Sequence, residues 1–236
     1  WLARWPAVAS ALQGLRLRGA ADLDANWQGG WQQQARALQI NARLRAPQLD
    51  WRSSPPDKTS PPGEGRLSAV QADLSGTLAD LAFSSQGQAG WGTRQLDWQV
   101  QAGAGQLKDT HWQGSLKQLK LSMKDSTQPG QWSLQTGVAE SRPILLDWLS
   151  AGSDNTLAIS AGSARLLGPQ PGEASLEWEP MEWTQRGIKT AASAKSKTQW
   201  HSRGHITGLP LAWLDTLSGK TMADLGAGMD VVSEGE

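Results

Sequence analysis

The sequence has no cysteine and no tyrosine, and its 236 residues include one phenylalanine and three histidines. Without cysteine, disulfides, thiolate metal ligands and cysteine nucleophiles are excluded within this chain. Net charge is also lacking, because 22 basic residues are matched by 22 acidic ones. A balanced chain has no bulk electrostatic field to attract phosphate backbones, so we expect no nucleic-acid partner.

Long hydrophobic runs are absent too. No stretch approaches the roughly 18 to 20 apolar residues that a membrane-crossing helix needs, and no basic, apolar and small-residue series predicts a signal peptide. The chain begins at Trp1 and ends within an alternating pattern, so we expect residues 1–236 to be one segment of a longer repetitive polypeptide. Any membrane anchor is then expected outside this segment.

Alternating patterns are abundant. In the run LRLRGAADLDANWQGGW, which starts at Leu15, apolar residues hold most odd positions, and arginine, aspartate and asparagine hold most even ones. Successive side chains of a β-strand point to opposite faces, so this run predicts a strand with one apolar and one polar face. The two glycines at 29–30 fit a hairpin turn, with a second alternating strand from Leu38.

The same alternation recurs along the chain and predicts an all-β protein of about 12 to 14 strands. At a spacing of about 4.8 Å, these strands would extend a sheet by about 60 to 65 Å. A change of register at Lys117 and Gln118 predicts a bulge or a turn there.

Four segments depart from the strand pattern. Residues 52–65 contain four prolines and predict a flexible surface loop, and lysine, alanine and serine at 191–198 predict another loop. Residues 1–14 and 208–219 have helical spacing and predict short helical insertions. Because each is followed by a strand-like run, we expect an internal repeat whose next unit starts within residues 208–236.

The sequence contains no complete catalytic motif among those we considered. The GKT at 219–221 resembles the end of a phosphate-binding loop, but Leu214 stands where that motif requires glycine. No G-x-S-x-G nucleophile motif occurs. The acidic pairs at 22 and 24 and at 177 and 179 hold polar strand positions, which favours opposite-charge pairing on a solvated face. We expect a non-enzymatic protein without a cofactor.

The histidines do not predict a metal site. His201 and His205 fall on one face of a strand, and at about 3.3 Å per residue they lie roughly 13 Å apart, too far to share one ion. His111 has no partner nearby in the sequence, so an exposed strand position is its default interpretation. We therefore expect no bound metal.

Tryptophan supplies many of the bulky apolar positions. Because several of these residues alternate in step with leucine and alanine, the pattern favours buried or groove-facing packing over exposed stacking platforms. They are Trp27, Trp91, Trp98, Trp132, Trp178 and Trp200.

Four stretches resemble the middle of proteins of the TamB family: LSGTLADLAFSSQGQAGWG from Leu74, HWQGSLKQLKL from His111, GQWSLQTG from Gly130 and HSRGHITGLPLAWLDTLSG from His201. This family comprises large periplasmic translocation and assembly proteins, related to AsmA-like lipid carriers. The resemblance implies an elongated, twisted and open antiparallel sheet, a taco shape with a hydrophobic groove. It also implies a periplasmic location in a Gram-negative bacterium, within a protein anchored in the inner membrane. Regions outside this segment would contact an outer-membrane barrel partner, TamA.

The function that the resemblance implies is one section of a hydrophobic groove that conducts phospholipid between the two membranes. The family is also linked to assembly of outer-membrane proteins and autotransporters. An apolar lining would suit phospholipid acyl chains, because a sixteen-carbon chain in water costs on the order of 12 kcal/mol. We expect the lining to include Leu15, Leu17, Leu23, Trp27, Leu38, Ile40, Leu44, Leu74, Leu81, Phe83, Leu96, Trp98 and Val100.

Two alternatives stay open. A chaperone-like groove could accept unfolded β-strands of outer-membrane proteins by edge pairing. A β-sandwich binding or adhesin module would instead bury its apolar faces against each other and leave no groove.

Overall fold

The computed structural model describes residues 15–29, 38–53, 63–108, 110–128, 130–137, 142–151, 154–190, 193–210, 212–213 and 228–235. In this part of the chain, fourteen strands form one sheet, and every pairing is antiparallel. The expected all-β fold, an open antiparallel sheet, is confirmed. A sandwich would need a second sheet, which the described strands do not form.

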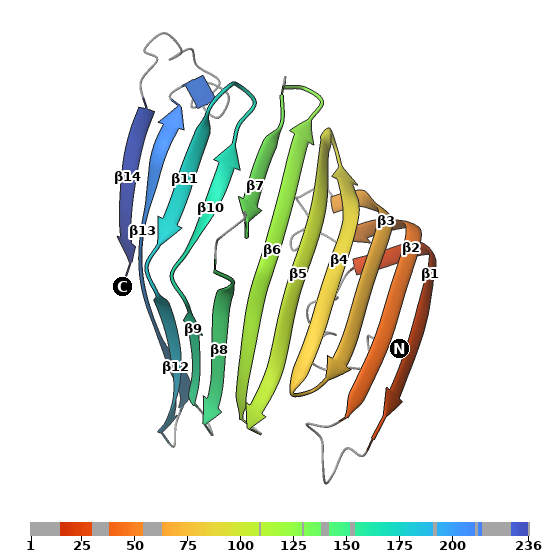
Figure 1. Cartoon of the computed structure of the whole chain (residues 1–236), viewed down its shortest axis with the longest axis vertical. Coiled ribbons are helices and arrows are strands. Elements are labelled where there is room, and N and C mark those ends of the chain that lie inside the picture. The colour runs from red at the N-terminus through yellow and green to blue at the C-terminus, as the bar shows by residue number, and fades with distance from the viewer. Residues whose placement is uncertain are drawn as a thin grey trace.

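The first six strands are long and follow one another across the sheet (Figure 1). They are β1 (Leu15–Gln28), β2 (Gln39–Ser53), β3 (Gly63–Thr77), β4 (Asp80–Trp91), β5 (Arg94–Lys108) and β6 (His111–Asp125). The other eight are β7 (Trp132–Thr136), β8 (Ile144–Ala151), β9 (Asp154–Ile159), β10 (Gly162–Leu167), β11 (Glu173–Trp178), β12 (Met181–Thr190), β13 (Ser193–Pro210) and β14 (Gly228–Gly235).

Six of the later strands are halves of three longer ones. One half of β6 pairs with β7 and the other half with β8, so β7 and β8 lie end to end beside it. The next position holds β10 and β9, and the one after it holds β11 and β12. The continuous strand β13 then pairs with both β11 and β12. Figure 1 shows the series β7, β10 and β11 above the series β8, β9 and β12.

The sheet is therefore narrower than the number of strands suggests. With each collinear pair counted as one, the described strands form a meander of eleven positions in which sequence neighbours are also spatial neighbours. Eleven positions at about 4.8 Å span about 48 Å. The expected number of strands is right, but the expected extension of 60 to 65 Å is too large, because three strands add no breadth.

The three interruptions lie at one level of the sheet, which we call the break line. It passes between β7 and β8, through Ser160 and Ala161, and through Glu179 and Pro180. Pro180 has no backbone N–H to give to a ladder, which explains the interruption before β12. On β6 the break line meets an extra residue, Lys117, between the paired Leu116 and Gln118. The bulge predicted there is confirmed.

A second set of irregularities bends β1 to β3. The register of β1 shifts between Ala20 and Asp22, and that of β3 shifts between Ser68 and Gln71. Within the latter, Ala69 has a φ of 51°, a left-handed backbone conformation unusual for a residue other than glycine. Bulges sharpen the local twist of a strand, and Figure 1 shows β1, β2 and β3 turning back behind β4.

Several loops and helices predicted from the sequence differ from those in the structure. Within 52–65, the residues at 52–53 complete β2 and those at 63–65 open β3; the rest, 54–62, lie outside the described residues. The loop predicted at 191–198 is wrong from Ser193 onward, because β13 begins there and pairs with β12, so cross-strand pairing overrides weak strand propensity. Residues 191–192 lie outside the described residues. The helix predicted over 208–219 is wrong in its first residues, which end β13.

Only residues 212–213 of that segment are described as helical. The helical insertion predicted at 1–14 lies outside the described residues, as do 214–227. Gly29 follows β1 with a φ of 119°, as a turn glycine can, while the second turn glycine lies outside the described residues. The internal repeat starting in 208–236 stays a prediction. In the described part of the chain, no helix has the length and apolar character to cross a membrane.

The strand β8 does not show the alternating pattern from which strands are predicted. The sequence of β8, ILLDWLSA, is apolar at both odd and even positions, so it shows no alternation. The structure explains the pattern, because Ile144 is buried whereas Leu145 and Leu149 are 43% and 42% exposed on the other face. A strand with large apolar residues on both faces is recognised only once its neighbours are known.

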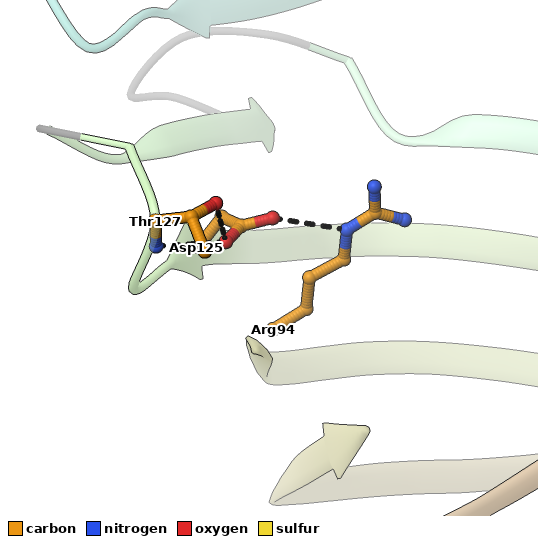
Figure 2. Close-up of polar contacts among 3 residues, drawn as sticks. All are labelled: Arg94, Asp125 and Thr127. Atoms are coloured by element: carbon orange, nitrogen blue, oxygen red, sulfur yellow. Dashed lines mark hydrogen bonds and ion pairs between the residues drawn. The ribbon is translucent and has the colours of Figure 1, made fainter. Parts of the chain in front are cut away.

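Asp125 closes the turn after β6. Its Oδ1 accepts hydrogen bonds from the backbone N–H of Thr127 at 3.0 Å and from the Thr127 hydroxyl at 2.6 Å. Its Oδ2 accepts one from Arg94 Nε at 3.2 Å, as Figure 2 shows. These donors, with the Thr127 hydroxyl the strongest, hold the pKa of Asp125 well below its ordinary value.

We expect the contribution of this turn to stability to be lost in acid. Because the folded-state pKa of Asp125 is lowered, its stabilisation is present above the unfolded pKa of about 3.9 and fades as pH falls below that value. Urea unfolding at a series of pH values should show Asp125→Asn destabilised at neutral pH and approaching the parent in acid. Thr127→Val, which removes the hydroxyl donor, should show a smaller change of the same sign. A parent-to-variant difference that stays constant with pH would contradict this role.

Candidate functional site: the apolar face of the sheet

Cross-strand register places the apolar positions of successive strands on one face. Paired residues project to the same side of a sheet, so a row can be followed from strand to strand. One row runs through Ala25, Ala42, Leu74, Phe83, Ala102, Leu116 and Ile144. Another runs through Trp27, Ile40, Gly76, Leu81, Ala104, Gly114, Leu146, Ile159 and Met181. We call this side the apolar face and the opposite side the polar face.

The predicted lining residues on strands share the apolar face. Leu15, Leu17, Leu23 and Trp27 lie on β1, Ile40 and Leu44 on β2, Leu74 on β3, Leu81 and Phe83 on β4, and Leu96, Trp98 and Val100 on β5. Leu38 immediately precedes β2. Their shared face is a property of the backbone register, whereas lipid binding by them stays a prediction.

Exposure differs widely among these residues, from fully buried to more than half exposed. On the outer strand β1, Leu17, Leu23 and Trp27 are 53%, 59% and 63% exposed. Leu38 is fully buried and Leu81 is nearly so, which means that these two pack against the protein and offer little surface to a ligand. The candidate surface is therefore smaller than the sequence predicts, and β1 carries its most accessible part.

Tryptophan rings lie across glycines on the neighbouring strand. A β-carbon added at Gly87 would stand 2.5 Å from the ring of Trp98, the residue paired with it, so the ring occupies the space of the missing side chain. Such aromatic cover of a strand glycine compensates for its lack of packing. The directly paired examples are Trp51–Gly65, Trp98–Gly87 and Trp178–Gly162.

The indole N–H groups of two of these rings are satisfied within the sheet. Trp98 Nε1 donates to Ser85 Oγ at 3.1 Å, and Trp178 Nε1 donates to the Ser160 carbonyl at 3.1 Å. A ring held in this way lies along the sheet and does not stand up from it. The sequence contains the tryptophans and glycines, but the pairing that joins them follows only from the register.

Opposite charges are paired across strands on the polar face. Arg43 Nε lies 2.7 Å from Asp73 Oδ1, and Arg66 Nε lies 2.8 Å from Asp50 Oδ1. The hydrogen bond from Arg66 lowers the pKa of Asp50, and that from Arg43 to Asp73 raises the pKa of Arg43. The side chains of these pairs are about half exposed or more, so solvent screens their attraction. They therefore add little to stability, and their main effect is to favour the observed register between the strands.

The acidic pairs singled out in the sequence lie in the same kind of ladder. Asp22 and Asp24 are directly opposite Arg45 and Arg43. Glu177 Oε2 lies 3.3 Å from His205 Nε2, and Glu179 Oε1 lies 3.8 Å from Arg203 Nη1. Each acidic side chain therefore faces a basic partner on the neighbouring strand.

His111 has a partner that the sequence does not reveal. Its Nε2 lies 2.9 Å from both carboxylate oxygens of Asp147, which is 36 residues away on β8. The interpretation of His111 as an unpartnered, exposed strand residue is wrong, because the pairing of β6 with β8 brings the two side chains together. Among the described residues, no group of three or more histidine and acidic side chains is placed to hold a metal ion.

Comparison of the chain with protein-family models, with curated proteins and with solved structures found no match. We therefore describe the class of protein from the fold and the two faces of the sheet alone. In the described residues it is an open antiparallel sheet with a continuous apolar face and a charge-paired polar face.

Proposed function

We propose that this chain is a non-enzymatic section of a hydrophobic β-groove that spans the periplasm and conducts phospholipid between the inner and outer membranes. In doing so it supports assembly of outer-membrane proteins and autotransporters. The observation that carries the proposal is the apolar face, which continues from strand to strand and exposes Leu17, Leu23, Trp27 and Phe83 by more than a third each. The resemblance of four stretches to the TamB family supports the same function.

The chemistry of the face suits an acyl chain that moves. A sixteen-carbon chain in water costs on the order of 12 kcal/mol, and an apolar lining removes most of that cost. The two rows combine large side chains with glycine and alanine, as at Leu81 and Ala104, and contain no polar side chain. Such a surface shelters methylene groups without holding one position more tightly than the next.

Site-specific photo-crosslinking tests the proposal in the full-length protein in cells. A photoreactive residue at Phe83, which is 38% exposed, should capture phospholipid, whereas one at Gln99 on the polar face should not. Native mass spectrometry of the purified chain should show phospholipid bound to the parent. Lipid captured at Gln99 and not at Phe83 would overturn the assignment of faces. Absence of lipid from both positions would overturn the proposed cargo.

A second candidate function is favoured by β1. Within the described residues this strand of 14 residues pairs only with β2, so its outer edge offers backbone donors and acceptors beside exposed leucines. A groove that accepts unfolded β-strands of outer-membrane proteins would use such an edge. Crosslinks from Leu17 or Leu23 to outer-membrane polypeptides, in place of lipid, would favour it.

A further inference from the structure

The polar face contains a hollow with an excess of positive charge. Its volume is about 870 Å³, and strands β1 to β4 and the turn after β4 line it. Four of its lining residues are arginines, namely Arg16, Arg18, Arg52 and Arg66, and two are acidic, namely Asp50 and Glu64. The others are glycines and three apolar residues, Leu17, Trp51 and Trp91. We call it the arginine hollow.

Two of the four arginines use only some of their hydrogen-bond donors within the protein. Arg66 donates from Nε to Asp50 at 2.8 Å, and Arg52 donates from Nη2 to Glu64 at 3.1 Å. A guanidinium carries five N–H donors, so each keeps donors for a second acceptor. Arg18 is directly opposite Asp50 and its charge helps to lower the pKa of that carboxyl, but neither Arg16 nor Arg18 makes a close ion pair or a hydrogen bond in the described part of the chain. The hollow therefore has a formal excess of two positive charges.

At one position of the hollow, the strand register places two like charges opposite each other. Elsewhere on β1 the ladder puts opposite charges together, as at Asp22 with Arg45 and Asp24 with Arg43. Within the hollow, Arg18 follows the same rule and is opposite Asp50, but Arg16 is directly opposite Arg52. Like charges directly opposite each other destabilise a sheet. A bound anion between the two guanidinium groups would remove that cost.

Glycine keeps the hollow open. Gly90 is directly opposite Arg66 on the polar face, where a side chain would project into the space beside the guanidinium. A β-carbon added there would meet only the Arg94 carbonyl, at 3.9 Å, so the position has room for a larger residue. At Gly92, with a φ of 55°, no atom lies within 4 Å of such a carbon. The hollow thus combines cationic walls with unfilled space.

We propose that the arginine hollow binds a phosphate group. The planar fork of guanidinium matches phosphate oxygens in two parallel hydrogen bonds, and an excess of two charges matches a phosphate monoester or inorganic phosphate. The group could belong to a lipid headgroup or to a small soluble phosphate, since both present the same oxygens. The four arginines hold polar-face positions of the register, and the proposed site does not depend on the proposed function.

Titration with inorganic phosphate at constant ionic strength, followed by calorimetry and by the amide resonances of Gly90 and Gly92, tests the proposal. The double variant Arg16→Gln with Arg18→Gln should weaken binding by about tenfold or more, through loss of charge-assisted hydrogen bonds. Arg45→Gln is the matched control, because Arg45 lies on the same face of β2 but does not line the hollow. Its affinity should stay within about twofold of the parent.

Gly90→Glu provides an independent variant. It leaves every arginine in place and puts a carboxylate opposite Arg66, so it should abolish phosphate binding while the circular dichroism spectrum is kept. Glycerol 3-phosphate and phosphatidylglycerol vesicles, tested with the same variants, identify the source. Arginine-dependent binding of the vesicles indicates a headgroup, and binding of the soluble phosphates alone indicates a small ligand. The proposal is overturned if phosphate binding does not saturate, or if Arg45→Gln weakens it as much as the double variant.

Discussion

Trp178→Ala should lower the free energy of unfolding by about 3 kcal/mol, as expected for removal of a largely packed aromatic side chain. Trp178 ends β11 at the break line and is paired with Gly162, the first residue of β10. A β-carbon at Gly162 would stand 2.4 Å from its ring and 3.2 Å from Ile144 Cγ1, which places the ring beside the buried Ile144. The substitution uncovers the glycine and leaves the Ser160 carbonyl without its indole donor.

Two further variants separate packing from hydrogen bonding. Trp178→Phe keeps an aromatic ring over Gly162 but loses the donor to Ser160, so it should cost about 1 kcal/mol. Trp27→Ala removes a tryptophan that is 63% exposed on β1 and should cost less than about 1 kcal/mol. Urea unfolding, monitored by far-ultraviolet circular dichroism, measures all three. Equal losses for Trp178→Ala and Trp27→Ala would show that the break line gains no stability from Trp178.

Phe83→Asp should reduce the phospholipid that accompanies the purified chain by about tenfold or more, because an acyl chain would have to pack against an ionised carboxylate. Phe83 lies in the row between Leu74 and Ala102 and is 38% exposed, so its side chain is accessible from the apolar face. The effect should appear as loss of lipid adducts in native mass spectra and as loss of lipid transfer in the full-length protein.

Ala82→Asp is the matched control for this experiment. Ala82 is the preceding residue of β4 and is exposed on the polar face, opposite Ser75 and Gly103. The same charge placed one residue away should leave bound lipid unchanged. If Ala82→Asp removes lipid as effectively as Phe83→Asp, the loss reflects a general disturbance of the sheet, and the apolar face is not the lipid surface.

The alternation of single residues predicts much of the fold. Leu74, Phe83 and Ala102 each stand in a period of two, and the pleat of a strand converts that period directly into a face. Antiparallel neighbours then bring the faces together without further information from the sequence. For this reason the shared face of the lining candidates follows from the sequence, whereas their exposure does not. Leu38 and Leu17 both hold apolar positions in an alternating run, yet one is fully buried and the other 53% exposed.

The breadth of the sheet depends on whether the chain turns back in a hairpin or continues straight at each interruption. Apolar residues change from odd to even positions between Ile159 and Gly162, and back again between Trp178 and Met181. A change of this kind shows that a strand is interrupted, but a hairpin and a straight continuation produce the same pattern. The outcome depends on partners distant in sequence, because the continuous strands β6 and β13 offer backbone groups on both sides of the break line.

The sequence by itself therefore determines that this protein is built of two-faced strands, because side-chain alternation is a local property of the backbone. The tertiary structure decides which strands are collinear, which tryptophan covers which glycine, and that His111 lies against Asp147. These are relations between residues that are far apart in the chain. They arise from cross-strand register, which no local pattern contains.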